Sequence, residues 1–427
     1  MKQATDIIDL AKQITNAAEV INAFSTANEV ALSYDPDTPD PAAVSAPNAQ
    51  AYHEACLNAT EALTEMKSLV LGNKSVFLDL MSNVYAASAI RVVLKYGIAK
   101  AVPLEGSISY SKLGAQCGLD TSTVQRILGV LMVYHIFQQP DMGHVSHTRL
   151  SHAMVTDEGL AATAKFLFED LASYSHRIPD ALDKWGPSPE ATETAFNLVH
   201  GTNSNVYDYM ARNKQYENTF VKVMEHIASS EVSNTNPLLD GFDWEGIGNG
   251  VVFDVAGSAG HVSIQLARRY PNLTFIVQDY ESVCRQGEAQ LPADLRDRVR
   301  FEARDMFQPH KRVPDKKTVY FLRNVFHNWS DKYARQILQA IIPALKSGDR
   351  IVLNEHIVPE PGTGSASVEK FARANDMTML SILNGQERTA QQFKDLVASA
   401  DPELKVLGVK TEPGLTHGVV EISFNEA

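Results

Sequence analysis

The stretch VVFDVAGSAGHVSIQLARRYPNLTFIVQD, residues 251–279, decides the fold of this chain. It reads as a buried strand, a tight turn of small residues, a helix, and a second strand that ends in Asp279. Such a turn lets a ligand approach bare backbone at a helix N-terminus, and an acid at the tip of the next strand can hold a ribose by its hydroxyl groups. The pattern therefore predicts a nucleotide-type site.

The turn itself indicates which nucleotide is bound. Dinucleotide-binding turns follow G-x-G-x-x-G and rest a pyrophosphate on the helix dipole. Here Asp254 precedes the small residues Ala256, Gly257, Ser258 and Gly260, and an acid at the strand end suits a cation such as the amino or sulfonium group of S-adenosylmethionine (SAM). The turn resembles motif I of class I SAM-dependent methyltransferases, D/E-x-G-x-G-x-G. Two of its glycines are replaced here, so weaker SAM binding is one expectation, and another Rossmann-like nucleotide enzyme is the alternative.

Composition and charge limit what the whole chain can be. With 427 residues, 44% of them apolar and 21% charged, it has the composition of a globular protein with two domains and an extension. The formal net charge of −13, without a basic stripe, argues against a nucleic-acid partner. The three cysteines are far apart and the N-terminus lacks a signal-peptide core, so we expect a cytoplasmic protein.

The N-terminal part of the chain is predicted to be helical. Apolar residues recur at helical spacing over 4–33, 49–71 and 76–96, and a Pro- and Asp-rich linker occupies residues 35–47. The most apolar helical stretch, residues 84–99, is interrupted by arginine and lysine and is not expected to span a membrane.

Residues 109–137 read as helix, turn and helix, and residues 138–151 can form a small β-wing. This winged-helix pattern suggests DNA binding, but the would-be recognition helix, residues 121–133, carries one Arg and no Lys. We therefore interpret it as a packing and dimerisation module, with the apolar face of residues 76–96 as a place for a second subunit to dock.

From residue 251 onward, strands alternate with helices, after a mostly helical segment over 160–240. This order predicts a Rossmann-like, doubly wound α/β sheet with ligands at the C-terminal ends of its strands. The predicted strands are residues 251–255, 273–277, 299–303, 318–322, 351–353 and one near 419–424.

Three domains follow from this reading. They are a helical N-terminal extension with its linker over residues 1–70, a winged-helix dimerisation domain over 71–160, and a SAM-binding catalytic domain with substrate-lid helices over 161–427.

Each predicted strand ends in polar residues that could carry chemistry. The first two end in Asp254 and Asp279, the third is followed by residues 304–307, the fourth runs into residues 321–331, and the fifth ends in residues 354–356. Because these ends meet at one edge of a parallel sheet, they favour an active site there.

His327 is the best candidate for a general base at that edge, since an imidazole titrates near neutral pH. It would need an orienting carboxylate on its other nitrogen, for which Glu355 and Glu387 are candidates. Taken alone, such a histidine is as readily a satisfied core residue. Trp329 could stack on an adenine or belong to the core.

Three longer motifs make a family resemblance specific. They are FLRNVFHNWSDKYARQIL (residues 321–338), NEHIVPEPG (354–362) and NGQERT (384–389). Together and in this order they resemble the plant and fungal O-methyltransferases of the caffeate type, nearest to the fungal secondary-metabolite branch. The similarity covers about residues 76–424, including the winged-helix region.

The resemblance implies a role for each matching residue, a homodimer, and SAM as cofactor. His327 would be the proton acceptor, flanked and oriented by Glu355 and Glu387. The cofactor would be held by Asp279 at the ribose, Asp305 and Met306 at the adenine, Arg323 and Trp329 nearby, and Asp254, Gly257 and Gly260 around the methionine moiety. Asn328 stands where the family usually has Asp.

The implied reaction is methyl transfer from SAM to a hydroxyl of a small aromatic or polyketide-like secondary metabolite. No metal is expected, because the histidines of the wing, which are read as surface residues, have no cysteine or carboxylate beside them; they are His144, His147 and His152.

Two rival hypotheses remain. In the first, the fold is kept without methyl transfer, as a cyclase, dehydratase or pericyclase in which SAM is structural or lost. There His135 and Arg323 could polarise a substrate carbonyl, although His135 is more readily explained as a buried structural residue. In the second, the chain is a non-enzymatic regulator that uses the winged helix.

Overall fold

A computed structural model describes residues 6–231, 240–363, 365–411 and 417–425. The chain divides into two compact units, one of residues Met1–Ser173 with Met210–Ser229 and one of Tyr174–Tyr209 with Ser230–Ala427. Parts of two expected helices, residues 4–5 and 232–239, lie outside the described residues.

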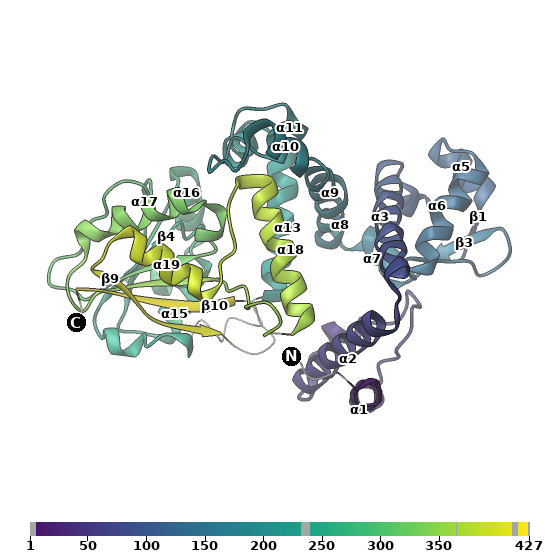
Figure 1. The fold of residues 1–427 in the computed structure, drawn as a ribbon, viewed down its shortest axis with the longest axis horizontal. Coiled ribbons are helices and arrows are strands. Elements are labelled where there is room, and N and C mark those ends of the chain that lie inside the picture. Colours follow the sequence, from purple (N-terminus) through teal and green to yellow (C-terminus); the bar gives the residue numbers. More distant parts are fainter. Residues whose placement is uncertain (1–5, 232–239, 364, 412–416, 426–427) are drawn as a thin grey trace. The chain divides into compact units, whose positions relative to one another are not determined.

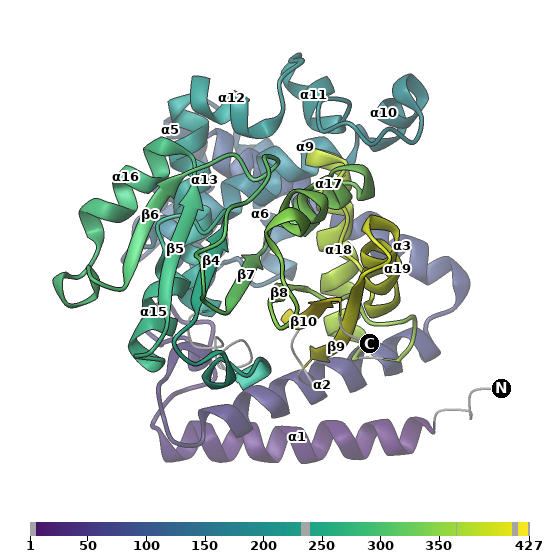
Figure 2. The ribbon, with the colours of Figure 1, turned by 90° about the vertical axis from the view of Figure 1, so that its left-hand side faces the viewer.

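The first unit is mostly helical (Figure 1). Its first two helices, α1 (Ile7–Ala27) and α2 (Ala49–Val70), pack side by side (Figure 2), and the linker between them contains a single 3-10 turn at Pro41–Ala43. The Asp6 side chain caps α1 by accepting a hydrogen bond from the Ile8 backbone. The further helices are α3 (Asn73–Lys95), α4 (Ile98–Ala101), α5 (Tyr110–Cys117), α6 (Thr121–Val133), α7 (Arg149–Thr156), α8 (Glu158–Lys165), the π-helix Phe166–Leu171 and α13 (Lys214–Glu231).

A small wing of strands completes the helix-turn-helix of this unit. Its strands β1 (Ile108–Ser109), β3 (His144–His147) and β2 (Phe137–Gln138) form a three-stranded antiparallel sheet in that order. The wing predicted from the sequence is therefore confirmed.

Two histidines of this region differ from their sequence interpretation. His147 is not a surface residue: it is 1% exposed, and its ring contacts Ser151 Oγ at 3.0 Å and the Val102 carbonyl at 3.2 Å. It faces inward because it lies on a strand whose last three residues are buried. His135 is exposed rather than buried; α6 ends before it, and its ring stacks on Tyr34 at 4.1 Å.

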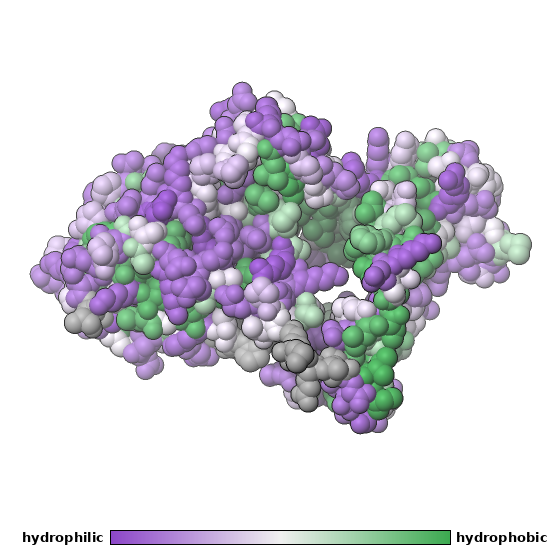
Figure 3. Space-filling view, viewed as in Figure 1, coloured by the Kyte–Doolittle hydropathy of each residue, from purple (hydrophilic) through white to green (hydrophobic). Residues whose placement is uncertain are grey.

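Helix α3 carries more exposed large apolar side chains than any other described helix of the first unit. Apolar residues gather over it in the space-filling view (Figure 3). By length and composition alone it could cross a membrane, and 22% of its most apolar window is buried. The mostly buried core helix of a soluble protein passes the same test. Its exposed apolar residues are Val76, Phe77, Leu78, Leu80, Met81, Val84 and Tyr85.

The second unit is built on a seven-stranded sheet with the order β6-β5-β4-β7-β8-β10-β9. Neighbouring strands are parallel from β6 to β8, while β10 is antiparallel to both β8 and β9. The strands are β4 (Val251–Val255), β5 (Thr274–Asp279), β6 (Val299–Ala303), β7 (Thr318–Arg323), β8 (Arg350–His356), β9 (Leu404–Thr411) and β10 (His417–Phe424). The doubly wound sheet is confirmed.

Helices cover both faces of this sheet, and each face has its own apolar core. On one face α17 (Asp331–Ile341) and α19 (Ala390–Ala400) bury residues such as Phe393 against the sheet. On the other, α15 (His261–Arg269) and Trp244 do so. The remaining helices are α9 (Ala172–Ser175), α10 (Ile178–Trp185), α11 (Ala195–His200), α12 (Val206–Arg212), α16 (Glu281–Gln290), α18 (Ala366–Leu383) and the 3-10 turns Glu245–Ile247, Ala293–Leu295, Phe326–Asn328 and Ile342–Ala344.

Candidate active site

The turn after β4 holds two residues in a conformation that favours glycine. Ala256 and Ser258 have φ angles of +57° and +53°, in the left-handed region. Glycine adopts this region without penalty, whereas other residues lose about 1–2 kcal/mol there. The family motif therefore has glycine where the turn demands it, and this chain keeps the conformation with an alanine and a serine.

The two glycines of the turn are required by protein neighbours. A Cβ on Gly257 would lie 2.4 Å from the carboxyl carbon of Asp254, and one on Gly260, whose φ is +78°, would lie 3.0 Å from the Phe301 ring. Their backbone forms the turn at the N-terminus of α15, as expected for the floor of a ligand site.

Asp254 is buried beneath this turn. It is 2% exposed, and its Oδ2 accepts a hydrogen bond from Ser263 Oγ at 2.6 Å. Burial raises the pKa of Asp254 to about 6; the Ser263 hydrogen bond opposes this rise and the charge of Asp279 adds to it. A bound cation would stabilise the charged form of this buried carboxyl group.

Asp279 ends β5 beside the same turn. Its carboxylate accepts hydrogen bonds from the backbone N–H of Ser258 at 2.9 Å and of Tyr280 at 2.7 Å. Burial raises its pKa, and these two donors oppose the rise. The carboxylate is thereby fixed at the strand tip, where a carboxylate can accept further hydrogen bonds from the hydroxyl groups of a ribose.

The expected adenine residues follow β6. Asp305 is exposed, and its Oδ1 accepts the Phe307 backbone N–H at 3.0 Å; Met306 is half-buried beside it. The Phe307 ring meets that of Trp329 edge-on at 5.0 Å, so Trp329 joins the third strand end to the turn after β7. A half-buried aromatic face beside an acid suits a nucleobase.

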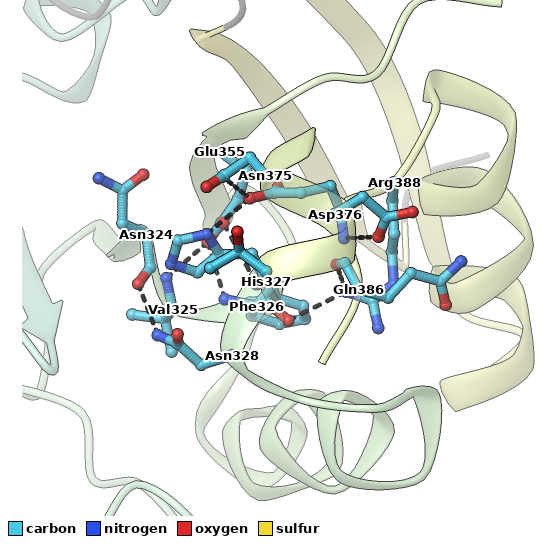
Figure 4. Close-up of polar contacts among 12 residues, drawn as sticks. Asn324, Val325, Phe326, His327, Asn328, Glu355, Asn375, Asp376, Gln386 and Arg388 are labelled. Carbon is cyan, nitrogen blue, oxygen red and sulfur yellow. Dashed lines mark hydrogen bonds and ion pairs between the residues drawn. The ribbon is translucent and has the colours of Figure 1, made fainter. Parts of the chain in front are cut away.

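The residues after β7 form the 3-10 turn Phe326–Asn328, which carries His327. The side-chain carboxylate of the buried Glu355, in β8, binds the backbone of this turn (Figure 4). Its Oε1 accepts the N–H groups of Val325 and Phe326, both at 2.8 Å, and its Oε2 accepts that of His327 at 3.4 Å. Glu355 was expected to orient the imidazole, but its hydrogen bonds go to the backbone of the turn.

Glu387 is the carboxylate that contacts the imidazole. Its Oε1 lies 2.8 Å from His327 Nδ1, and the same oxygen accepts a hydrogen bond from Asn375 Nδ2 at 2.5 Å. Glu387 itself is held by the donation of its backbone N–H to Asp376 at 2.9 Å. A neutral imidazole that donates from Nδ1 has Nε2 as its acceptor, which is the form a general base requires.

The electrostatics of this dyad favour the protonated imidazole. Burial alone lowers the pKa of His327, but the Glu387 hydrogen bond and the charges of Glu355 and Glu387 outweigh burial, and the pKa is raised. Burial raises the pKa of Glu355, and the charge of His327 opposes that rise. His327 can therefore hold a proton that it has accepted.

A second pair of histidines lies beside His327; His356 belongs to the polar strand end that the sequence indicated, whereas His417 was not predicted to lie there. The rings of His356 and His417 are 3.8 Å apart, and the His356 ring is 6.3 Å from that of His327. His417 Nε2 contacts Asn324 Oδ1 at 2.9 Å. Burial lowers the pKa of His356 to about 4; the charge of Glu387 opposes this fall, and those of His327 and Arg323 add to it. Burial lowers the pKa of His417 further, so neither ring is charged near neutral pH.

The sheet brings the predicted site residues to one edge. Asp254 pairs in register with Phe321 of β7, two residues before Arg323, and the charge of Arg323 lowers the pKa of Asp254. The proposed cofactor residues follow β4, β5 and β6, and His327, the proposed base, follows β7 between Glu355 and Glu387. In the described part of the chain, no group of three or more His, Cys, Asp or Glu residues is arranged to hold a metal ion.

Comparison with known proteins agrees with this architecture. Family models for an O-methyltransferase domain and for an O-methyltransferase dimerisation domain match residues 183–401 and 78–157. The O-methyltransferase PaMT of Phomopsis amygdali is 32% identical over 429 residues, covering 99% of this chain and 98% of that protein. LepI in complex with SAM has a TM-score of 0.69 at 20% identity, covering 97% of this chain and 99% of that one. A structure described as a pericyclic reaction enzyme has a TM-score of 0.67 at 20% identity, covering 97% and 100%.

The sheet order, the acid-bearing turn and the strand-end residues define a SAM-dependent methyltransferase fold, and SAM is its cofactor. Within that class, the chain belongs to the O-methyltransferase family.

Proposed function

We propose that this chain transfers a methyl group from SAM to a hydroxyl of a small aromatic or polyketide-like secondary metabolite, with His327 as general base. The contact that supports this proposal most directly is the one of 2.8 Å between His327 Nδ1 and Glu387 Oε1. It supports an imidazole whose other nitrogen accepts a proton at the carboxyl edge of the sheet.

When bound, SAM supplies an electrophilic methyl group on a sulfonium. The residues of the chain have the other tasks. His327 Nε2 accepts the proton of the acceptor hydroxyl, and Glu387 with Glu355 stabilises the imidazolium that results. Asp254 and Asp279 place negative charge where a cationic cofactor would bind, and Asp305, Met306 and Trp329 would take its adenine. Alignment of the two reactants contributes much of the rate.

Methyl transfer is tested by incubating the purified protein with methyl-labelled SAM and a panel of phenols and hydroxylated polyketides. We expect label in an ether product for the natural protein, and none for His327→Ala, whose affinity for SAM by calorimetry stays within about twofold. The exposed His53 on α2 gives a matched control in His53→Ala. If His327→Ala keeps activity within a few-fold, the base is assigned wrongly.

A second candidate is a cyclisation, dehydration or pericyclic reaction on the same fold. The strained Ala256 and Ser258 in the SAM turn favour it, because a poorer cofactor turn suits a reaction that does not consume SAM. The same incubation separates the two functions: ring formation or loss of water without SAM consumption supports this candidate.

The dimerisation-domain match and the exposed apolar face of α3 also support a homodimer, which we include in the proposal. An acidic chain with this fold fits a cytoplasmic enzyme of small molecules and not a binder of nucleic acid or membrane.

A further inference from the structure

The buried Arg388 is a charged residue that the proposed reaction does not use. It directly follows Glu387 in the chain and is 1% exposed. A guanidinium this far from water is stable only where every donor finds an acceptor. The acceptors of its hydrogen bonds therefore indicate which part of the structure Arg388 stabilises.

Those partners surround the turn that carries His327. Arg388 Nη1 donates to the carbonyl of Phe326 at 3.0 Å, and Nη2 donates to that of Trp329 at 2.9 Å. These carbonyls lie on either side of His327. The remaining bonds go from Nη1 to the Gln386 carbonyl at 3.1 Å and from Nε and Nη2 to Asp331 Oδ1 at 3.0 and 2.7 Å.

The backbone beside Arg388 adds to this contact. Gln386 donates its N–H to the His327 carbonyl at 2.9 Å, and a Cβ on Gly385 would lie only 2.2 Å from that same oxygen. Residues 385–388 thus lie directly against the turn. One short segment supplies Glu387 to the imidazole and Arg388 to the backbone that carries it (Figure 4).

The N–H groups of the turn are bound by one element and its carbonyl groups by another. Glu355 of β8 accepts the N–H groups of residues 325–327, while Arg388 donates to the carbonyls of Phe326 and Trp329. The turn is therefore fixed by a carboxylate on its donor side and by a guanidinium on its acceptor side. Neither contact uses the imidazole.

From this geometry we infer that Arg388 is a positioning residue, which fixes the His327 imidazole against Glu387 by clamping the carbonyls of its turn. The inference rests on the proposed role of His327 as base. Arg388 contacts no reacting atom; it acts through the turn.

Lysine cannot replace this arrangement. Arginine presents five donors in a planar fork, whereas an ammonium is a compact point charge with three donors on a flexible stem. Arg388→Lys keeps the charge near Asp331 but cannot reach the three carbonyls and the carboxylate together. We expect the turn to gain freedom, and a misplacement of about 1 Å at a catalytic group lowers a rate by about 100-fold.

The test compares Arg388→Lys with the natural protein, and with Arg285→Lys as a matched control on the exposed surface of α16. We expect kcat per folded molecule to fall about 10- to 100-fold in Arg388→Lys, with KM for SAM within about twofold, and no change in the control. Asp331→Ala keeps the arginine and removes the half-exposed carboxylate that accepts from Nε and Nη2, so it should show a smaller loss of the same kind.

A readout independent of turnover is the pKa of His327, measured by NMR with histidine-selective labelling and assigned with His327→Gln. Loosening the contact with Glu387 removes the interaction that raises this pKa, so we expect it to fall in Arg388→Lys. The acid limb of the rate profile should move to lower pH with it. The titratable groups that act on His327 or lie near it are Glu355, Glu387, His356 and His417.

The possible outcomes separate the two proposals. A lower His327 pKa in both variants supports positioning, even if the natural protein transfers no methyl group and the proposed function fails. Positioning is overturned if the His327 pKa and the acid limb of the rate profile stay unchanged and activity falls only in proportion to the unfolded fraction. Arg388 is then a purely structural residue. If Arg388→Lys does not fold, an unchanged His327 pKa in Asp331→Ala, which removes the accepting carboxylate, overturns positioning equally.

Discussion

Ala256 illustrates how a single residue can retain strain in a functional turn. Its φ of +57° is one that an alanine adopts at a cost of about 1–2 kcal/mol. Ala259 in the same turn lies outside the left-handed region. The two alanines therefore form a matched pair in one local environment.

We predict that Ala256→Gly stabilises the protein by about 1 kcal/mol, because glycine adopts the left-handed region without strain. Ala259→Gly should instead destabilise it by about 1 kcal/mol, since Ala259 is 6% exposed and loses a buried methyl group. Urea unfolding of the three proteins measures both changes. Equal destabilisation by both substitutions would contradict the strain assigned to Ala256.

The contact of Glu387 with His327 predicts a pH dependence. The pKa of His327 is raised, and a base must be neutral to accept a proton, so activity should rise as pH increases through a value above the ordinary histidine range. Glu387→Gln removes the charge and should move this limb to lower pH while lowering kcat about 100-fold, because the imidazolium loses its partner. A kcat–pH profile at saturating substrate measures both effects. A limb that stays in place would show that another group titrates.

Gly385 determines how closely two segments approach. A Cβ there would meet the His327 carbonyl at 2.2 Å and the Asn328 carbonyl carbon at 2.8 Å, both of which are backbone atoms that cannot swing aside. We predict that Gly385→Ala destabilises the protein by about 1–3 kcal/mol and lowers kcat, because the turn that carries His327 must shift.

Gly408 in β9 provides the control for this prediction, since a Cβ there meets nothing within 4 Å. Gly408→Ala should leave stability within about 0.5 kcal/mol and kcat unchanged. Thermal unfolding and steady-state kinetics of both variants make the comparison. A Gly385→Ala protein with natural kcat would show that the turn tolerates displacement.

Much of the second unit could be predicted from the sequence because its signals are local. Strands such as β4 are short apolar runs, and Asp279 ends such a run, so both the sheet and its polar edge were predicted. Strand β9 was missed because only its first residue is fully buried and its apolar residues do not stand out. An edge strand that is mostly exposed has little hydrophobic pattern to detect.

The contacts around His327 were less predictable, because they join segments far apart in the chain. The sequence indicated a carboxylate beside the imidazole but not that Glu355 would bind backbone and Glu387 the ring. Asn375 and Arg388 were missed altogether. A buried arginine looks like an exposed one in sequence until the carbonyls that surround it are known.

The exposed apolar face of α3 has a consequence for the assembled protein. Phe77 and Leu80 are 75% and 55% exposed, on a helix that overlaps the dimerisation-domain match. An exposed apolar surface of this kind is characteristic of protein–protein or membrane interaction sites. By length and composition α3 could also be a membrane helix. The oligomeric state and solubility of the purified protein distinguish a subunit interface from a membrane helix.

We predict that the natural protein is a dimer in detergent-free buffer and that Phe77→Asp with Leu80→Asp yields a monomer, because charges in the centre of an apolar interface are not paired. Met142→Asp is the control, since Met142 is 94% exposed at the tip of the wing, away from α3. Light scattering after size exclusion should give twice the chain mass of 46.9 kDa for the natural protein and the control, and the single mass for the double variant. A natural protein that is monomeric, or soluble only with lipid or detergent, would contradict the assignment of α3 to a subunit interface. Far-ultraviolet circular dichroism of the double variant separates loss of the dimer from loss of the helix. A monomer that keeps the helix content of the natural protein has lost the interface and not the fold of α3.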